Sequence, residues 1–103
     1  MDVRQGFAAH PLPQLPMVVL EHSRDTQRFP NPIGWEPQWP VAELQQIWQR
    51  AQDELAMLVP GTAHRIAWDS GHLIMVDQPQ VVADAVRDVV DAARNGETRL
   101  DPP

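Results

Sequence analysis

Residues 64–79 decide the fold that this sequence favours: His64-Arg-Ile-Ala-Trp-Asp-Ser-Gly-His72 runs directly into Leu73-Ile-Met-Val-Asp-Gln-Pro79. The first five residues, 64–68, are typical of a β-strand. Asp, Ser and Gly are turn-forming residues, so residues 69–72 predict a tight turn after that strand. An apolar stretch, residues 73–76, follows, and Pro79 comes three residues after it. Proline suits the first turn of a helix, because the backbone N–H groups there have no partner within the helix and proline lacks this group.

The last helix is predicted from the spacing of apolar residues beyond this proline. They recur at three- and four-residue intervals, as on one helix face: Val82, Ala85, Val86, Val89 and Ala93. Asp77 with Gln80 three residues later predicts a capping pair at the start. Arg94 suits the negative end of the helix dipole, and Asn95-Gly96 predicts the stop.

The upstream half supplies one more strand and one more helix. Residues 17–20, Met-Val-Val-Leu, follow Pro16 as a short apolar run typical of a buried strand. Prolines crowd residues 21–40 and predict a long loop, of the kind that commonly covers a site. Residues 41–58 predict a helix that stops at Pro60-Gly61. Its expected apolar face consists of Leu44, Ile47, Trp48, Ala51, Leu55 and Leu58.

This order of elements predicts an α/β fold. The helix at 41–58 is long enough to cross over between two parallel strands, which gives a βαβα unit. We expect a lead-in segment over residues 1–15, the folded unit over 16–96 and a flexible tail over 97–103. Because a two-stranded parallel sheet leaves both edges open and buries little area, we interpret the unit as part of a larger α/β domain.

Composition excludes several classes of function. The chain has 103 residues, 43% of them hydrophobic, and a net charge of −6, with eight basic residues that are all arginine. A nucleic-acid or anionic-membrane surface would repel it, so neither is expected as a partner. There is no cysteine, which rules out disulfides and thiolate chemistry. The N-terminal residues lack a signal-peptide pattern and no apolar run spans a bilayer, which predicts a cytoplasmic protein.

Three stretches together resemble the C-terminal portion of the α/β-hydrolase fold family. They are Pro16-Met-Val-Val-Leu-Glu-His-Ser-Arg-Asp25, Trp48-Gln-Arg-Ala-Gln-Asp-Glu-Leu-Ala-Met-Leu-Val-Pro60, and the segment 64–79. The resemblance covers residues 16–94. It implies a late strand bearing the acid of a catalytic triad, then a helix, then the last strand with the triad histidine.

The resemblance also implies roles for single residues. His72 would be the general base and acid, and Asp25 the carboxylate that orients it, with Glu21 as the nearest rival. The implied chemistry is serine-dependent acyl transfer to water in the esterase, lipase or C–C hydrolase range. It requires neither a cofactor nor a metal, and the expected substrate is a small ester-like molecule.

The nucleophile of that family is missing. The only serines are Ser23 and Ser70, and neither lies in a Gly-X-Ser-X-Gly elbow. We therefore expect a C-terminal fragment that is inactive alone and acts only when an N-terminal half completes it. The alternative is a non-catalytic acidic module that pairs its open sheet edges with a partner or with a second copy.

Other interpretations have less support. A metal site would draw on residues at the strand ends: His22, His64, Asp69 and His72. Without cysteine or a helical His-x3-His pair, the sequence favours no metal. His72 could instead serve only as a loop residue, and Asp25 as a solvated acid beside Arg24 or Arg28. Trp35 and Trp39 are expected to cover the open end of the core, with a substrate pocket as the alternative.

Overall fold

The computed structural model describes residues 5–6 and 9–100. Strand β1 (Val18–His22) and strand β2 (Ala63–Ala67) pair in parallel along their whole length and form a two-stranded sheet. The predicted α/β class and the predicted parallel pair are thus confirmed. The carboxyl ends of both strands meet at one edge of the sheet, which we call the carboxyl edge.

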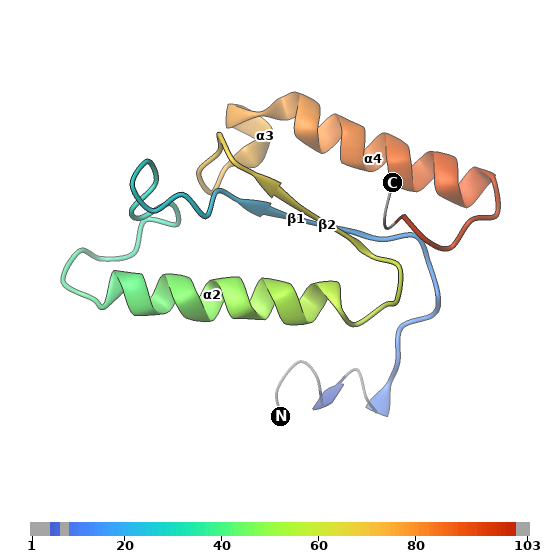
Figure 1. The fold of residues 1–103 in the computed structure, drawn as a ribbon, viewed down its shortest axis with the longest axis horizontal. Helices are drawn as coiled ribbons and strands as arrows, with labels where there is room; N and C mark the ends of the chain where they lie inside the picture. Colours follow the sequence, from blue (N-terminus) through green and yellow to red (C-terminus); the bar gives the residue numbers. More distant parts are fainter. Residues whose placement is uncertain (1–4, 7–8, 101–103) are drawn as a thin grey trace.

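Two long helices enclose the sheet. Helix α2 (Val41–Ala56) joins the strands and lies on one face, and helix α4 (Pro79–Arg94) lies on the other (Figure 1). Helix α2 starts where the sequence predicts and ends two residues before the predicted 58. Between β2 and α4 the chain forms a one-turn helix that the sequence did not predict, α3 (Ile74–Asp77), near the carboxyl edge.

Strand β1 extends beyond the predicted 17–20 to include Glu21 and His22, both of which are buried. The prediction ended the strand at the first charged residue, since an isolated carboxylate is costly to bury. Here the Glu21 carboxylate is compensated by Arg24 and His64, so the strand continues.

Large apolar side chains remain exposed on several elements. Strand β2 lies one residue earlier than the predicted 64–68, and Trp68 is consequently outside it and 55% exposed. The other exposed large apolar residues on α2, α3 and α4 are Ile47, Met75, Val76, Val86 and Val90. Within the described part of the chain, no helix has the length and apolar character needed to cross a bilayer.

The predicted apolar faces of the two helices are only partly correct. In α2, Ile47 is 54% exposed and Gln45 is buried in its place, and in α4 the buried residues are Ala85 and Ala92 while Val86 is exposed. Neighbouring strands lie about 4.8 Å apart, whereas a helix is about 10 Å wide. A two-stranded sheet is therefore too narrow to cover a full helix face.

The predicted capping pair at the start of α4 is wrong. Gln78 occupies the N-cap position without a side-chain cap, although the predicted proline does stand in the first turn. The Asp77 carboxylate instead accepts a hydrogen bond from the Gly71 amide, and the Gln80 amide group donates to Asp84. Asp77 is thus used to hold the preceding loop, which sequence spacing does not reveal.

The chain after α4 folds back onto the start of β2. The predicted stop Asn95-Gly96 is confirmed, with Gly96 in the left-handed region at φ +72°. The amide of Leu100 then donates a 2.8 Å hydrogen bond to the Gly61 carbonyl. This contact lies within residues 97–103, the predicted flexible tail, of which residues 101–103 lie outside the described residues.

Candidate functional site at the carboxyl edge

A backbone hydrogen bond joins the starts of the two loops that leave the carboxyl edge. The amide of Ser23 donates to the carbonyl oxygen of Ser70 over 2.9 Å. Both serines are buried, Ser70 completely. This hydrogen bond therefore fixes the start of the loop that carries Asp25 next to the start of the loop that carries His72.

The loop before His72 is held by residues 77 and 78. The Gln78 Oε1 atom accepts hydrogen bonds from the Ser70 hydroxyl, at 2.6 Å, and from the Asp69 amide, at 3.1 Å. The Asp77 Oδ2 atom accepts one from the Gly71 amide at 2.9 Å. Three consecutive residues of this turn are thereby tied to the junction between α3 and α4.

His72 lies at the end of this held turn with an exposed side chain. Its amide donates to the Pro32 carbonyl, which connects the turn to the long proline-containing loop. Its ring centroid lies 6.4 Å from the His22 ring and 6.4 Å from the Trp48 ring, edge-on to both. The imidazole is thus accessible at the carboxyl edge, as a general base needs to be.

Asp25 lies in the loop that follows β1 and is also exposed. Its Oδ1 atom accepts hydrogen bonds from the amides of Gln27 and Arg28, at 3.1 and 3.2 Å, and so closes a short turn. In the described structure no hydrogen bond joins Asp25 to His72. Both residues follow strands at the same edge, but the structure does not pair them.

Glu21, the rival acid, is engaged elsewhere. Its side chain is 1% exposed, and Oε1 lies 2.5 Å from Arg24 Nη2 and 2.5 Å from His64 Nε2. The same Arg24 nitrogen lies 2.7 Å from Asp53 Oδ1 on α2. Glu21, Arg24, Asp53 and His64 together form what we call the Glu21 cluster, between the sheet and α2.

Arg24 provides the positive charge of the Glu21 cluster. Its hydrogen bond to Glu21 raises the pKa of Arg24 above its usual value, against partial burial, which lowers it, and Asp53 raises it further. A charge left unpaired in such a place costs several kcal/mol, about 3–5 when one partner of a buried pair is removed. The cluster therefore fixes the end of β1 against α2.

Three members of the Glu21 cluster carry metal-ligand atoms. One ligand atom each from Glu21, Asp53 and His64 lie within 4.8 Å of one another. Arg24 Nη2 bridges the two carboxylates, however, and so already takes the place that a cation would occupy. The donor set does not favour a metal ion while Arg24 remains there.

The structure separates the residues of the metal site that the sequence offered as an alternative. His64 pairs with Glu21, and Asp69 forms an ion pair with Arg28. The rings of His22 and His72 lie with their centroids 6.4 Å apart.

The ring contacts of His22 and Trp48 at this edge were not predicted from the sequence, which offered His22 as a metal ligand and Trp48 as a core residue. Their rings stack with centroids 5.9 Å apart and an interplanar angle of 12°; with His72 they form what we call the ring cluster. Three atoms are buried without a hydrogen-bond partner among the described residues: His22 Nε2, Trp48 Nε1 and the Oε1 atom of Gln45, one helical turn before Trp48. Each such atom costs about 1–3 kcal/mol. The available signal was the position of His22, directly after a strand at the edge that carries His72.

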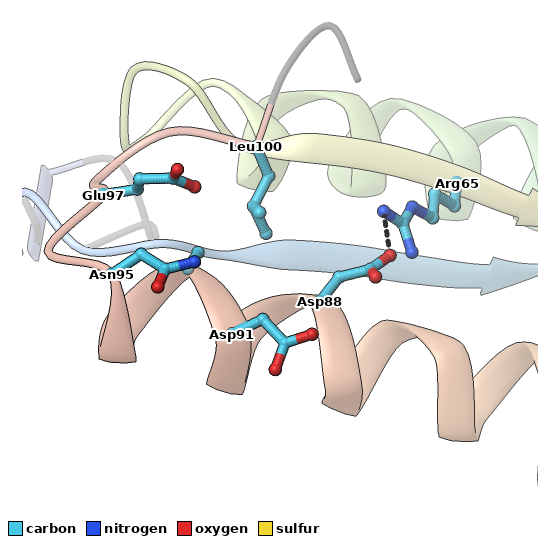
Figure 2. A pocket seen from close by; sticks show the side chains of 7 residues that line it. Arg65, Asp88, Asp91, Asn95, Glu97 and Leu100 are labelled. Atoms are coloured by element: carbon cyan, nitrogen blue, oxygen red, sulfur yellow. Dashed lines mark ion pairs between the residues drawn. The ribbon is translucent and has the colours of Figure 1, made fainter.

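Two shallow pockets lie away from the ring cluster. One, of about 380 Å³, adjoins the Glu21 cluster on α2, and Arg24 and Arg50 lie on its wall. The other, of about 270 Å³, lies between β2, α4 and the returning tail (Figure 2). There Arg65 reaches across from β2 to Asp88 of α4 at 2.8 Å, and Leu100 points into the space between them. Neither pocket includes His72 or Asp25.

Comparison with known proteins gives no match to a protein-family model, to a curated protein or to a solved structure. Any functional inference therefore rests on the residues and geometry of this chain.

Proposed function

We propose that this chain is the C-terminal part of a serine hydrolase of the α/β-hydrolase type, with His72 as its general base and acid. The observation that carries the proposal is the placement of His72, an exposed imidazole on a turn tied down by Asp77 and Gln78 at the carboxyl edge of a parallel sheet. In open parallel sheets, catalytic groups gather at that edge. The resemblance over residues 16–94 supports the same reading.

The reaction follows from the role of His72. A serine supplied by further strands, on the same polypeptide or on a partner, attacks the ester carbonyl while His72 takes the hydroxyl proton. His72 then returns that proton to the leaving alcohol. A water molecule, deprotonated by His72, attacks the acyl-serine, and His72 gives that proton back to the serine oxygen as the acid leaves. The substrate is a small ester-like molecule, and the mechanism uses no cofactor.

Asp25 is the proposed orienting acid. It is exposed, and the two hydrogen bonds that its carboxylate accepts in the described structure both use Oδ1. Glu21 is less suitable because its carboxylate already serves Arg24 and His64 inside the Glu21 cluster. Asp25 is therefore the more accessible of the two candidate carboxylates.

The test uses the full chain, isolated from the cells that encode it together with any polypeptide that completes it. Hydrolysis of p-nitrophenyl acetate is compared between wild type and His72→Ala, with His10→Ala as the control because His10 is an exposed histidine of the lead-in segment. We expect kcat to fall by about 10²–10⁴-fold in His72→Ala and to stay unchanged in the control. Equal hydrolysis by wild type and His72→Ala would refute the proposal.

The second candidate is a non-catalytic acidic module that pairs with a partner or with a second copy. Among the described residues each strand has one unpaired edge, and Trp68 at the end of β2 is 55% exposed. Open edges and exposed apolar groups favour strand addition. A stable complex without any hydrolysis of p-nitrophenyl acetate is the result that favours this candidate.

A further inference from the structure

His22 is a buried titratable residue to which the proposed reaction assigns no role. It is the last residue of β1, it is only 2% exposed, and its ring lies edge-on to His72 at an interplanar angle of 66°. It is thus the side chain of the ring cluster that connects the proposed base to the interior of the fold.

The hydrogen bonds of His22 fix its tautomer. Nδ1 lies 3.0 Å from the carbonyl oxygen of Ser23, and since a carbonyl only accepts, Nδ1 carries the hydrogen. In the neutral ring Nε2 then bears a lone pair. That atom is buried and has no partner within the described structure. The ring therefore presents one unused acceptor, and stacking on Trp48 holds its orientation.

Two neighbouring rings carry an N–H group, and geometry distinguishes between them. Trp48 is stacked nearly parallel to His22, so its N–H lies in a separate plane and cannot point at His22 Nε2. His72 meets His22 edge-on, which is the arrangement that allows a ring N–H to approach a ring nitrogen. Because the His72 side chain is exposed, it is free to rotate toward this acceptor.

We propose that His22 is the positioning residue for His72, its Nε2 accepting a hydrogen bond from a His72 ring N–H directly or through one water. This inference rests on the proposed function. The bond fixes which His72 nitrogen bears the hydrogen and leaves the other as the free base. Neutral His72 has a single ring N–H. In the completed hydrolase His22 Nε2 and the Asp25 carboxylate therefore share that hydrogen, and the other His72 nitrogen stays the free base.

The test is to determine the tautomers of His22 and His72 by long-range proton–nitrogen NMR. The full chain is measured at about pH 8, above the ordinary pKa of histidine. We expect His22 to hold its hydrogen on Nδ1 and His72 to show one dominant tautomer. His22→Phe keeps an aromatic ring against Trp48 but removes the acceptor, and we expect His72 to become a mixture of tautomers. His22→Gln restores an acceptor and should return His72 toward one tautomer, whereas His10→Gln should change nothing.

Two results would overturn the inference. One is the finding that His22 in the wild type carries its hydrogen on Nε2; this measurement does not depend on the folding of any variant. The other is an identical His72 tautomer ratio in wild type and in folded His22→Phe. In the hydrolytic complex we expect His22→Phe to lower kcat about 10-fold or more with little change in KM. If His22→Phe changes the His72 tautomer ratio but His72→Ala does not change hydrolysis, the His22–His72 contact is supported and the proposed function is refuted.

Discussion

Glu21 of β1 and Arg24 of the loop after it form a 2.5 Å ion pair in which the carboxylate is almost fully buried and the guanidinium about one-fifth exposed. The pair joins the end of the strand to α2, because the same Arg24 nitrogen also contacts Asp53. This contact lets a charged residue occupy the sheet at its carboxyl edge.

Arg24→Met is expected to destabilise the fold by about 3–5 kcal/mol, because it leaves the buried Glu21 carboxylate with His64 as its only partner. Urea unfolding followed by tryptophan fluorescence measures the loss. The matched control is Arg28→Met, which removes a surface ion pair with Asp69 and should cost less than about 1 kcal/mol. Equal losses in the two variants would contradict a structural role for the Glu21 cluster.

The turn that carries His72 depends on Gln78. In Gln78→Ala the fully buried Ser70 hydroxyl loses its acceptor, so we expect a loss of about 1–3 kcal/mol in the free energy of unfolding. Gln80→Ala is the control, since Gln80 is exposed and bonds only to Asp84. Thermal unfolding of both variants should separate them. If Gln78→Ala is as stable as the control, the turn is held by something else.

Gly61 and Gly34 offer a comparison of two glycines with the same backbone conformation. Their φ angles are +84° and +83°, so alanine at either position costs about 1–2 kcal/mol. A Cβ at Gly61 would in addition lie 2.7 Å from Arg99 Cγ, whereas at Gly34 nothing lies within 4 Å. In urea unfolding, we expect the free energy of unfolding of Gly61→Ala to be lower than that of Gly34→Ala by about 1 kcal/mol or more. Equal stability would mean that the tail does not pack on Gly61.

The two candidate acids are expected to behave differently on substitution. Asp25→Asn keeps an Oδ1 acceptor for the turn at Gln27 and Arg28, so the fold should be unaffected while kcat of the hydrolytic complex falls by about 10²-fold or more. Glu21→Gln should instead lower stability through the Glu21 cluster. Loss of activity in folded Glu21→Gln, with Asp25→Asn fully active, would reverse the assignment.

Local patterns predicted most of the fold. The apolar spacing from Val41 and the proline and glycine stops placed both long helices, and the length of the crossover predicted the parallel pairing. The extent of β1 was not predictable, because it depends on Arg24 and His64 reaching Glu21 after folding. The exposure of Ile47 likewise follows from the narrowness of the sheet.

The candidate site was predictable only in outline. The order of the elements predicted that Asp25 and His72 would follow strands at one edge. Their hydrogen bonds were not predictable, since the Asp25 carboxylate closes its own turn and the His72 loop is held by side chains from residues 77 and 78. The contact between His22 and His72 depends on how the loop after β2 folds toward the end of β1, which residue spacing does not determine.

The central claim, that His72 activates a serine supplied by further strands, is tested most directly by the rate of fluorophosphonate labelling. This reagent reacts with a serine that a neighbouring base has activated. In the complex isolated with the full chain, we predict labelling of one serine, and a rate about 10²-fold or more slower with His72→Ala than with wild type. Absence of labelling, or equal rates with both chains, would contradict the account.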